Sequence, residues 1–376
     1  MLNRNILLRA TIWIVVPILF ATFLGGENIT RELDTLVFGF RAIGSLLNSH
    51  SSQAKLTDFT NEFNRFIRRK CERGCHPVHN TEEFEWMREL RGQYIVMQEE
   101  YEDFLQRGHK FPYFHEYKHY TDPGDDDYSK ERTRSNISSV WNAIWLKAWG
   151  KETEMGRRFF PRTMAAIRKT PLSTAMLSLL QPRHGVRWHE GYFNGILRYH
   201  VGIQIPAGGK DGRGMRGGSK SREEFRNNNT NNEDRPILPR KDHHRGQPSL
   251  FIKNTTCGPD GSLLEKHDNH DGGDNENSRI RLGWFNGSDL LFDDTFTHGV
   301  VNPTASNRLV LFGDVVRYDC PMLLGGLLHF LCHTVIHRVS PIIQEIVKFS
   351  DDYAAACQRV EDNHKIATIK DDASTV

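Results

Sequence analysis

The first pattern in the chain is an uncharged, largely apolar stretch from residue 10 to residue 26, with two arginines before it and two glutamates after it. Its 17 residues lie at the short limit for a membrane-spanning helix and slightly above the usual length of a signal-peptide core. Cleavage after Gly25 or Gly26 would place Phe23 or Leu24 where a small residue is needed. The sequence therefore favours an uncleaved anchor over a cleaved signal peptide, with the basic end in the cytoplasm.

A second pattern, between residues 80 and 108, is typical of an amphipathic helix. The tetrapeptide Asn80-Thr81-Glu82-Glu83 has the form of a capping box, and Gly108 is a typical C-terminal stop. Between them, apolar positions recur every three or four residues, at Leu90, Tyr94, Met97, Tyr101 and Leu105. The sequence predicts one helix here, whose apolar stripe covers the β-structure that follows.

Strict alternation between residues 196 and 206 predicts a strand with two different faces. One face is apolar and packs, and it consists of Leu197, Tyr199, Val201, Ile203 and Ile205. The other face is more polar and consists of Arg198, His200, Gly202 and Gln204. An arginine buried on that face needs an anion, which a dicarboxylate or an internal salt bridge can supply.

The segment from residue 207 to residue 279 interrupts this pattern. It is rich in Gly, Asn, Asp and His and short of large apolar residues, so it cannot bury enough apolar surface to offset the entropy of ordering. We expect a mostly disordered, low-complexity insertion, with a short strand near Ser249-Leu250-Phe251-Ile252 that rejoins a sheet.

Beyond residue 321 the chain is again apolar and helical in pattern, up to about residue 347. His329, His333 and His337 are four apart and would line one helical face, a spacing that permits metal binding. A packing helix or a membrane-surface helix is the favoured interpretation, since these histidines and Arg338 interrupt any membrane span.

Composition excludes one class of partner and is neutral on others. The 49 basic and 47 acidic residues are interspersed and give a net charge of +2, so there is no electrostatic case for nucleic acid. The 376 residues could hold two domains of roughly 150 residues each, but the low-complexity segment favours one folded domain with attachments.

Sequons and cysteines are compatible with the lumen of the secretory pathway. Cys71 and Cys75 could form a local disulfide in an oxidising compartment or could equally stay unpaired, and no cysteine spacing matches a zinc finger. Five Asn-x-Ser/Thr triplets could accept glycans, at Asn28, Asn136, Asn228, Asn254 and Asn286.

The candidate chemistry rests on two histidines, His189 and His298, which lie in strand-like segments. A non-haem iron oxygenase normally binds its metal with two histidines and a carboxylate. The residue two after His189, where that carboxylate would stand, is Gly191, and Glu190 would point to the opposite face of the strand. The sequence therefore offers two metal ligands and a vacancy.

Around these histidines several short motifs occur in a fixed order. They are Phe160-Pro161-Arg162-Thr163, Leu177-Ser178-Leu179-Leu180-Gln181-Pro182, His189-Glu190-Gly191, Leu197-Arg198-Tyr199-His200-Val201-Gly202, Leu290 to His298, and Arg308-Leu309-Val310-Leu311-Phe312. Over residues 160–321, and more loosely from about residue 94, the chain resembles the catalytic domain of the aspartyl/asparaginyl β-hydroxylase family of Fe(II)- and 2-oxoglutarate-dependent dioxygenases. Members of that family use His-x-Gly and two protein ligands, so the vacancy fits the resemblance.

The resemblance implies a role for each site residue. Fe(II) is expected on His189 and His298, with O2 as the oxidant and 2-oxoglutarate as co-substrate. Asp293 and Asp294 are expected to orient the loop or to bond His298 from behind. Four residues are expected to bind 2-oxoglutarate: Arg198 and His200 near the metal, and Arg308 with Ser178 at the distal carboxylate.

The fold that the resemblance implies is α+β: a double-stranded β-helix, the jelly-roll or cupin-like barrel, with flanking helices and an N-terminal transmembrane helix. The expected organisation has four parts. Residues 1–26 are the cytoplasmic tip and anchor, 27–93 a luminal stalk and helical region, 94–320 the hydroxylase-like domain with the insertion 207–279, and 321–376 a C-terminal helical tail.

The expected activity is hydroxylation of a C–H bond by a membrane-anchored enzyme. Asp or Asn side chains of secretory-pathway proteins are the first substrate, and a lipid acyl chain is the alternative, because lipid A 2-hydroxylases share the resemblance. A non-catalytic membrane-anchored scaffold with the same barrel is a third hypothesis. Basic residues before the anchor predict a single-pass type II protein of the endoplasmic reticulum or Golgi, with a luminal catalytic domain.

Overall fold

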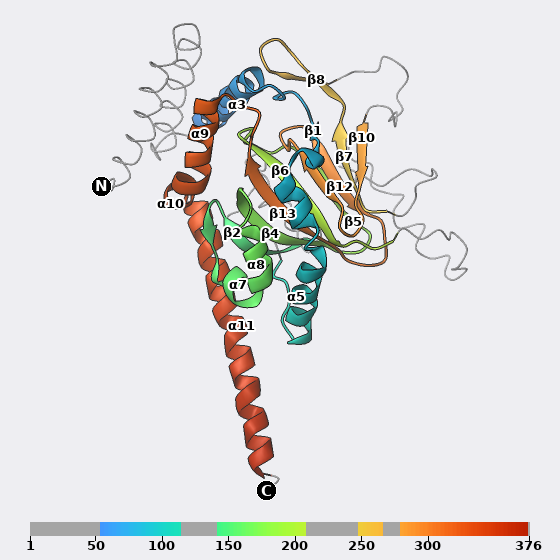
Figure 1. The fold of residues 1–376 in the computed structure, drawn as a ribbon, viewed down its shortest axis with the longest axis vertical. Coiled ribbons are helices and arrows are strands. Elements are labelled where there is room, and N and C mark those ends of the chain that lie inside the picture. Colours follow the sequence, from blue (N-terminus) through green and yellow to red (C-terminus); the bar gives the residue numbers. More distant parts are fainter. Residues whose placement is uncertain (1–52, 114–140, 208–246, 266–278, 375–376) are drawn as a thin grey trace, which may run out of the picture.

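The computed structural model describes residues 53–113, 141–207, 247–265 and 279–374. The predicted anchor at residues 10–26 and the sequons at Asn28, Asn136 and Asn228 lie outside the described residues. Figure 1 shows strands gathered in one body, short helices beside them, and a long C-terminal helix that extends away.

The strands form two antiparallel sheets, so the fold mixes helices with antiparallel β-structure. The seven-stranded sheet has the order β1 (Val78–His79), β11 (Asp289–Phe292), β6 (Ile196–Gln204), β13 (Arg308–Val316), β4 (Leu172–Leu180), β2 (Trp141–Ala148) and β3 (Lys151–Glu152). The four-stranded sheet has the order β10 (Arg279–Gly283), β7 (Ser249–Lys253), β12 (His298–Asn302) and β5 (His184–His189).

The predicted alternation along β6 is confirmed. Leu197, Tyr199, Val201 and Ile203 are all fully buried, and they join a large core cluster with residues of the helices α4 (Glu85–Arg91), α5 (Tyr94–Gln106), α7 (Glu154–Phe159) and α8 (Pro161–Ile167). The opposite face of the sheet carries Arg198 and His200. Register places Asp314 and Phe312 of β13 directly opposite these two residues.

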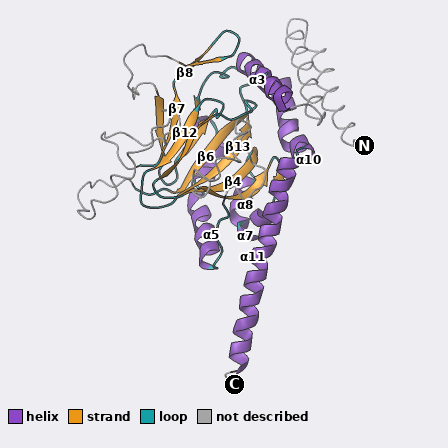
Figure 2. Ribbon diagram, turned by 180° about the vertical axis from the view of Figure 1, so that it is seen from behind, coloured by secondary structure: helices purple, strands orange, loops and turns teal. Residues whose placement is uncertain are grey.

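The face that carries Arg198 and His200 packs against the four-stranded sheet, because the two sheets contribute to one hydrophobic cluster. Leu180, Phe292 and Val310 of the seven-stranded sheet pack with Leu250, Ile252 and Val300 of the four-stranded sheet. The two sheets therefore lie face to face (Figure 2), and residues on the inner faces are enclosed between them.

The helix predicted between residues 80 and 108 is in fact three pieces. The Asn80 side chain caps a 3-10 turn at Thr81–Glu83, and α4 and α5 follow with a break at Gly92. The Gly92 N–H closes the last turn of α4 on the carbonyl of Arg88. This break shifts the buried stripe of α5, so Phe104 is buried and the predicted Leu105 is 41% exposed.

The predicted strand near residue 250 is confirmed as β7, which lies between β10 and β12. More of the insertion is ordered than the composition indicated, because β8 (Thr255–Cys257) and β9 (Leu263–Glu265) form a hairpin after it. Residues 208–246 and 266–278, the rest of the insertion, lie outside the described residues.

The cysteine pairing differs from the local bridge that the sequence allowed. Cys71 pairs with Cys320, and Cys75 pairs with Cys257, at sequence separations of 249 and 182 residues. Both bridges start just after α3 (Gln53–Lys70), and they fasten it to the segment after β13 and to the β8–β9 hairpin. Cys332 and Cys357 are buried and unpaired.

The histidine-bearing segment after residue 321 packs against the domain. It consists of α9 (Met322–Phe330), a π-helical turn (Leu331–Val335) and α10 (Ile336–Val339), followed by α11 (Pro341–Ser374). The rings of His329 and His333 stack at 4.2 Å, whereas the Nδ1 atom of His337 lies 2.9 Å from the carbonyl oxygen of Trp149. Among the described helices, Met322–Val339 is the stretch long and apolar enough to cross a membrane, by length and composition only, and 39% of it is buried in the fold.

A buried histidine in β1 makes the stability pH-dependent. Burial, followed by the charge of Arg317, lowers the pKa of His79 to about 4, and its Nδ1 atom lies 3.0 Å from the Tyr318 hydroxyl. Between pH 6.5 and pH 4 the unfolded chain therefore binds more protons than the folded chain, so stability falls as the pH falls. From pH 7 to pH 5 we expect His79 to remove about 2 kcal/mol of unfolding free energy.

Urea unfolding of the wild type and of His79→Gln at pH 7 and pH 5 measures this effect. The variant should lose less stability on acidification than the wild type, because every other titrating group is common to both. Equal losses in the two proteins would show that His79 does not carry this pH dependence.

Candidate functional site

The structure brings His189 and His298 together. His189 ends β5 and His298 begins β12, and the two residues are direct partners in the sheet. Their ring centroids are 4.2 Å apart, with an angle of 49° between the ring planes. His298 is 6% exposed and His189 is half-buried, so the pair is enclosed on one side and open to solvent on the other.

Hydrogen bonds set the tautomer of both rings. The Nδ1 atom of His189 lies 2.8 Å from the carbonyl oxygen of Arg187, and Nδ1 of His298 lies 2.9 Å from that of Phe296. A carbonyl oxygen only accepts, so each Nδ1 carries the proton and each Nε2 keeps a lone pair. Burial, followed by the charge of His189, holds the pKa of His298 well below its usual value. The two rings are therefore oriented by backbone carbonyls through Nδ1, an arrangement typical of metal-binding histidines.

The vacancy at Gly191 is filled from another loop. A Cβ atom built on Gly191 would lie 2.3 Å from the carboxylate carbon of Asp294. The Gly191 N–H also donates to the Asp294 carbonyl at 2.7 Å. Asp294 is buried, and its Oδ1 atom has no hydrogen-bond partner among the described residues. The site therefore has a buried carboxylate next to Gly191, supplied by Asp294, with one oxygen atom free to accept a hydrogen bond among the described residues.

Arg198 is held by two carboxylates. Its Nη2 atom lies 2.5 Å from Oδ2 of Asp294 and its Nε lies 2.9 Å from Oδ1 of Asp314, and its guanidinium stacks 3.9 Å from the Phe312 ring centre. Burial raises the pKa of both carboxyl groups, and Arg198 opposes that shift. The internal salt bridge that the sequence left open is thus present, and a co-substrate carboxylate would have to bind Arg198 in addition to these partners.

Arg308 is also buried, but unlike Arg198 it contacts no carboxylate among the described residues. It is 3% exposed, and its Nε and Nη1 atoms have no hydrogen-bond partner among the described residues. Its guanidinium lies 4.8 Å from the ring centre of Trp284. Burial alone lowers the pKa of Arg308 to about 9. Arg308 is therefore a buried cation with no anionic partner in the part of the chain that the structure describes.

His200 and Ser178 share the inner face with Arg308. Neither ring nitrogen of His200 has a partner in the described part of the chain, and burial, then Arg308, holds its pKa well below the usual value. The Ser178 hydroxyl accepts a 2.9 Å bond from Trp141, which leaves its own proton able to donate. Ser178 faces Val310, and Arg308 lies two residues earlier on the same strand and the same face. These groups form a buried polar cluster, in which donor atoms of Arg308 and His200 have no hydrogen-bond partner among the described residues.

Three neighbours were not assigned a site role from the sequence. Trp284 covers Arg308, Trp141 orients Ser178, and Asp314 pairs with Arg198. The sequence alone does not show these contacts, because each joins residues far apart in the chain, as the register that pairs Asp314 with Arg198 illustrates.

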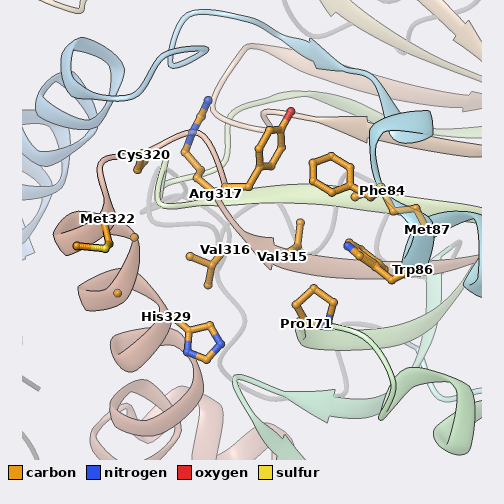
Figure 3. Close-up of a pocket in the computed structure, with 13 residues that line it drawn as sticks. Phe84, Trp86, Met87, Pro171, Val315, Val316, Arg317, Cys320, Met322 and His329 are labelled. Carbon is orange, nitrogen blue, oxygen red and sulfur yellow. The ribbon is translucent and has the colours of Figure 1, made fainter.

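Two other features of the described residues do not coincide with this site. The cluster of Cys71, Asp319 and Cys320 has ligand-like spacing, but both sulfur atoms are in a disulfide and cannot ligate. A groove of about 330 Å³ lies between α9 and the end of β13, and Figure 3 shows Met322 and His329 beside Val316 there. None of the predicted site residues lines it.

Comparison with known proteins finds a family match that spans the site residues. The family model "Aspartyl/Asparaginyl beta-hydroxylase" matches residues 92–227 and 275–318, which include all six predicted site residues. The ornithine lipid ester-linked acyl 2-hydroxylase of Rhizobium tropici is 24% identical over 245 residues, covering 65% of this chain. The chain spans 62% of the length of that relative.

Two solved structures are similar to the chain at lower sequence identity. AviO1 from Streptomyces viridochromogenes Tue57 is 12% identical with a TM-score of 0.28, and the match covers 69% of this chain and 96% of AviO1. The non-heme monooxygenase ThoJ, in a nickel complex, is 9% identical with a TM-score of 0.26, covering 68% of this chain and 77% of ThoJ. Over the residues of the family match, which contain both histidine motifs, the chain is similar to the aspartyl/asparaginyl beta-hydroxylase family.

Proposed function

We propose that the chain is an Fe(II)- and 2-oxoglutarate-dependent dioxygenase that hydroxylates a C–H bond. One observation carries the proposal: a buried arginine without an anion, Arg308, shares an enclosed face with donors of Ser178 and His200, next to two Nε2 lone pairs. Leaving such a cation unpaired costs several kcal/mol, which a bound carboxylate would recover. A dicarboxylate could bind Arg308 with one carboxylate and reach a metal on His189 and His298 with its other end.

Charge balance supports binding of the two cofactors as a pair. The buried charged groups around the site are Arg198 and Arg308, which are positive, and Asp294 and Asp314, which are negative when ionised beside Arg198. A divalent cation and a dicarboxylate together add no net charge to this enclosed set. Either one alone would leave two uncompensated charges in a low-dielectric region.

In the proposed reaction the protein binds, orients and excludes water. When bound, iron and 2-oxoglutarate supply the oxidising chemistry, with O2 and 2-oxoglutarate yielding succinate, CO2 and one oxygen atom for the substrate. His189 and His298 would hold the metal through Nε2, and Arg308 with Ser178 would hold the distal carboxylate. Trp284, Phe292 and Phe312 surround His200 at ring distances of 5.1 to 5.7 Å and keep that end dry.

We further propose that the two sheets are the halves of a double-stranded β-helix, with the site between them. Face-to-face packing and the inner position of all four co-substrate residues support this. Since His189 is the more exposed histidine, we expect the substrate to approach from its side.

For the substrate we propose a lipid acyl chain first. The Rhizobium tropici relative is named for acyl hydroxylation of ornithine lipid. Asp or Asn side chains remain a prediction of the family resemblance. Two disulfides support an oxidising compartment, and with it the predicted type II orientation in the endoplasmic reticulum or Golgi lumen.

Anaerobic titration of the purified chain with Fe(II) and 2-oxoglutarate tests the cofactor proposal. A weak visible charge-transfer band should form, and air should then convert 2-oxoglutarate to succinate. Mass spectrometry of a membrane lipid extract and of an Asp-containing peptide should show the gain of one oxygen in one of them. Absence of the band and of succinate with both substrates would favour the scaffold hypothesis.

A further inference from the structure

Helix α3 lies before the family match, which starts at residue 92, yet it contacts both loops that carry the metal-site histidines. Asn64 contacts the loop after His189. Its Oδ1 atom accepts the Asn194 backbone N–H at 2.8 Å, and its Nδ2 donates to the carbonyl of Tyr192 at 3.0 Å. Asn64 is 6% exposed, so these bonds replace water that the side chain has lost.

Arg68, one turn further along α3, contacts the loop before His298. Its Nη2 atom donates to the Thr295 hydroxyl at 2.8 Å, and Nη1 donates to the carbonyl of Gly261 at 3.3 Å. Thr295 is three residues before His298 and is 2% exposed. The same helix face thus reaches both histidine loops.

The two loops are also joined to one another beneath the helix. Asn194 donates through Nδ2 to Asp293 at 3.0 Å and to Thr295 at 3.1 Å. Arg317, which is fully buried, donates through Nη1 to both Asp293 and Asn194, at 2.8 and 2.7 Å. A movement of either loop would therefore break bonds to the other loop and to α3.

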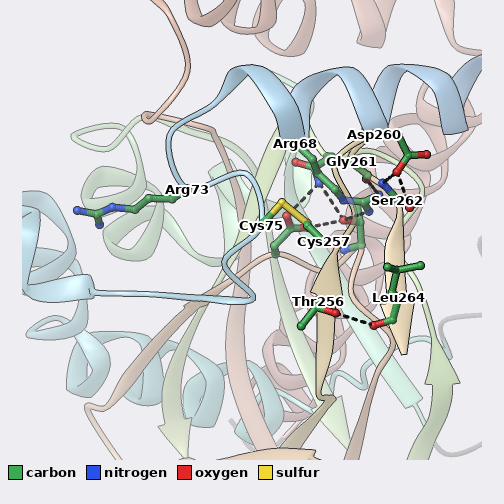
Figure 4. The surroundings of a disulfide bond; sticks show 12 residues. Arg68, Arg73, Cys75, Thr256, Cys257, Asp260, Gly261, Ser262 and Leu264 are labelled. Carbon is green, nitrogen blue, oxygen red and sulfur yellow. Dashed lines mark hydrogen bonds between the residues drawn. A yellow bond between two sulfur atoms is a disulfide. The ribbon is translucent and has the colours of Figure 1, made fainter. Parts of the chain in front are cut away.

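The position of α3 is itself fixed by covalent bonds. Cys71 and Cys75 follow the helix directly and lead to Cys320 and Cys257. Figure 4 shows the Cys75–Cys257 bridge beside Arg68 and Gly261. The hairpin approaches so closely that a Cβ on Gly261 would lie 2.5 Å from the carbonyl of Arg65.

The two histidines are paired in the sheet, but both lie at the ends of their strands. His189 is the last residue of β5 and His298 the first residue of β12, and the pairing of these strands shifts register between His298 and Val300. Residues at strand ends take their orientation from the loops that follow or precede them. Those loops are the segments that Asn64 and Arg68 hold.

We propose that Asn64 and Arg68 are positioning residues of the metal centre, through which α3 sets the separation of His189 and His298 and so the metal affinity. This inference rests on the proposed function, because it takes the two histidines as metal ligands. It assigns a role in the site to a segment that the family match does not include.

The test measures Ni²⁺ affinity of the full chain by isothermal titration calorimetry, without co-substrate and without turnover. Asn64→Ala and Arg68→Met should each weaken binding by about 10- to 100-fold, the range typical of residues that orient metal ligands. Arg68→Lys should recover part of the loss, since a lysine can still donate to Thr295. Asn64→Asp, which keeps the acceptor for Asn194 and loses the donor to Tyr192, is a milder variant if Asn64→Ala does not fold.

Ile67→Ala is the matched control. Ile67 lies between the two residues on α3, is fully buried and packs in the core cluster, so its truncation lowers the thermal midpoint. Metal affinity should stay at the wild-type value in this variant. Equal weakening in Ile67→Ala and Asn64→Ala would overturn the inference, because helix stability alone would then explain the loss.

The outcomes separate the inference from the proposed function. A wild-type chain that binds no divalent metal contradicts the proposed function. A wild-type chain that binds Ni²⁺, with Asn64→Ala and Arg68→Met binding equally well, overturns the positioning role and leaves the proposed function standing.

Discussion

Replacing Arg308 by methionine is expected to abolish 2-oxoglutarate turnover and, at the same time, to stabilise the cofactor-free protein. The loss of turnover follows because Arg308 is the buried cation proposed to hold the distal carboxylate. The gain in stability, about 1–4 kcal/mol, follows because the arginine is buried without an anion and methionine fills similar space without a charge. Thermal unfolding with and without 2-oxoglutarate, together with succinate release, measures both effects.

Arg198→Met is the matched control, and it should lower the unfolding free energy instead of raising it. Arg198 is paired with Asp294 and Asp314, so its removal leaves two buried carboxylates without their cation. We expect this variant to lose about 3–5 kcal/mol. If Arg308→Met is destabilised as much as Arg198→Met, the unpaired state of Arg308 is wrong, and with it the strongest support for a carboxylate site.

Replacing His298 by alanine is expected to weaken divalent-metal binding by at least about 100-fold and to remove the charge-transfer band. His298 supplies one of two imidazoles, and no side chain at Gly191 can replace it. Calorimetric Ni²⁺ titration and anaerobic absorption measure the loss. A His298→Ala chain with wild-type affinity and full turnover would contradict the ligand assignment.

His333→Ala is the control for that experiment. His333 stacks on His329 in the segment after residue 321, where the sequence left metal binding open. Metal affinity should be unchanged in His333→Ala, because the described site lies between the sheets. A loss equal to that of His298→Ala would move the metal to the helical segment.

Side-chain alternation predicted which residues of β6 face the site, whereas the pairing of the strands was needed to show their neighbours. The alternation in β6 correctly separated Arg198 and His200 from the packing face, since a period of two needs only the local sequence. It could not show that Asp314 stands opposite Arg198, because strand partners are chosen in three dimensions. The carboxylate of Asp294 against Gly191 depends likewise on the path of a loop 103 residues further on.

Local helix signals had a similar limit. Asn80 was correctly predicted as a cap, but the predicted helix is a 3-10 turn followed by α4 and α5. Met87 and Phe104 are buried in the core, and neither belongs to the predicted apolar stripe. The cysteine partners were beyond local reasoning altogether, since Cys71 and Cys75 are near each other in sequence and yet pair with residues far along the chain.

The long span of the Cys71–Cys320 bridge has a consequence for biosynthesis. During translation Cys71 emerges 249 residues before Cys320, so this bridge cannot close until almost the whole domain has been synthesised, whereas Cys75 can pair with Cys257 earlier. Disulfide formation takes seconds to hours and depends on an oxidant and an isomerase. Closure of the Cys71–Cys320 bridge is thus a late step of folding whose rate depends on the oxidant present.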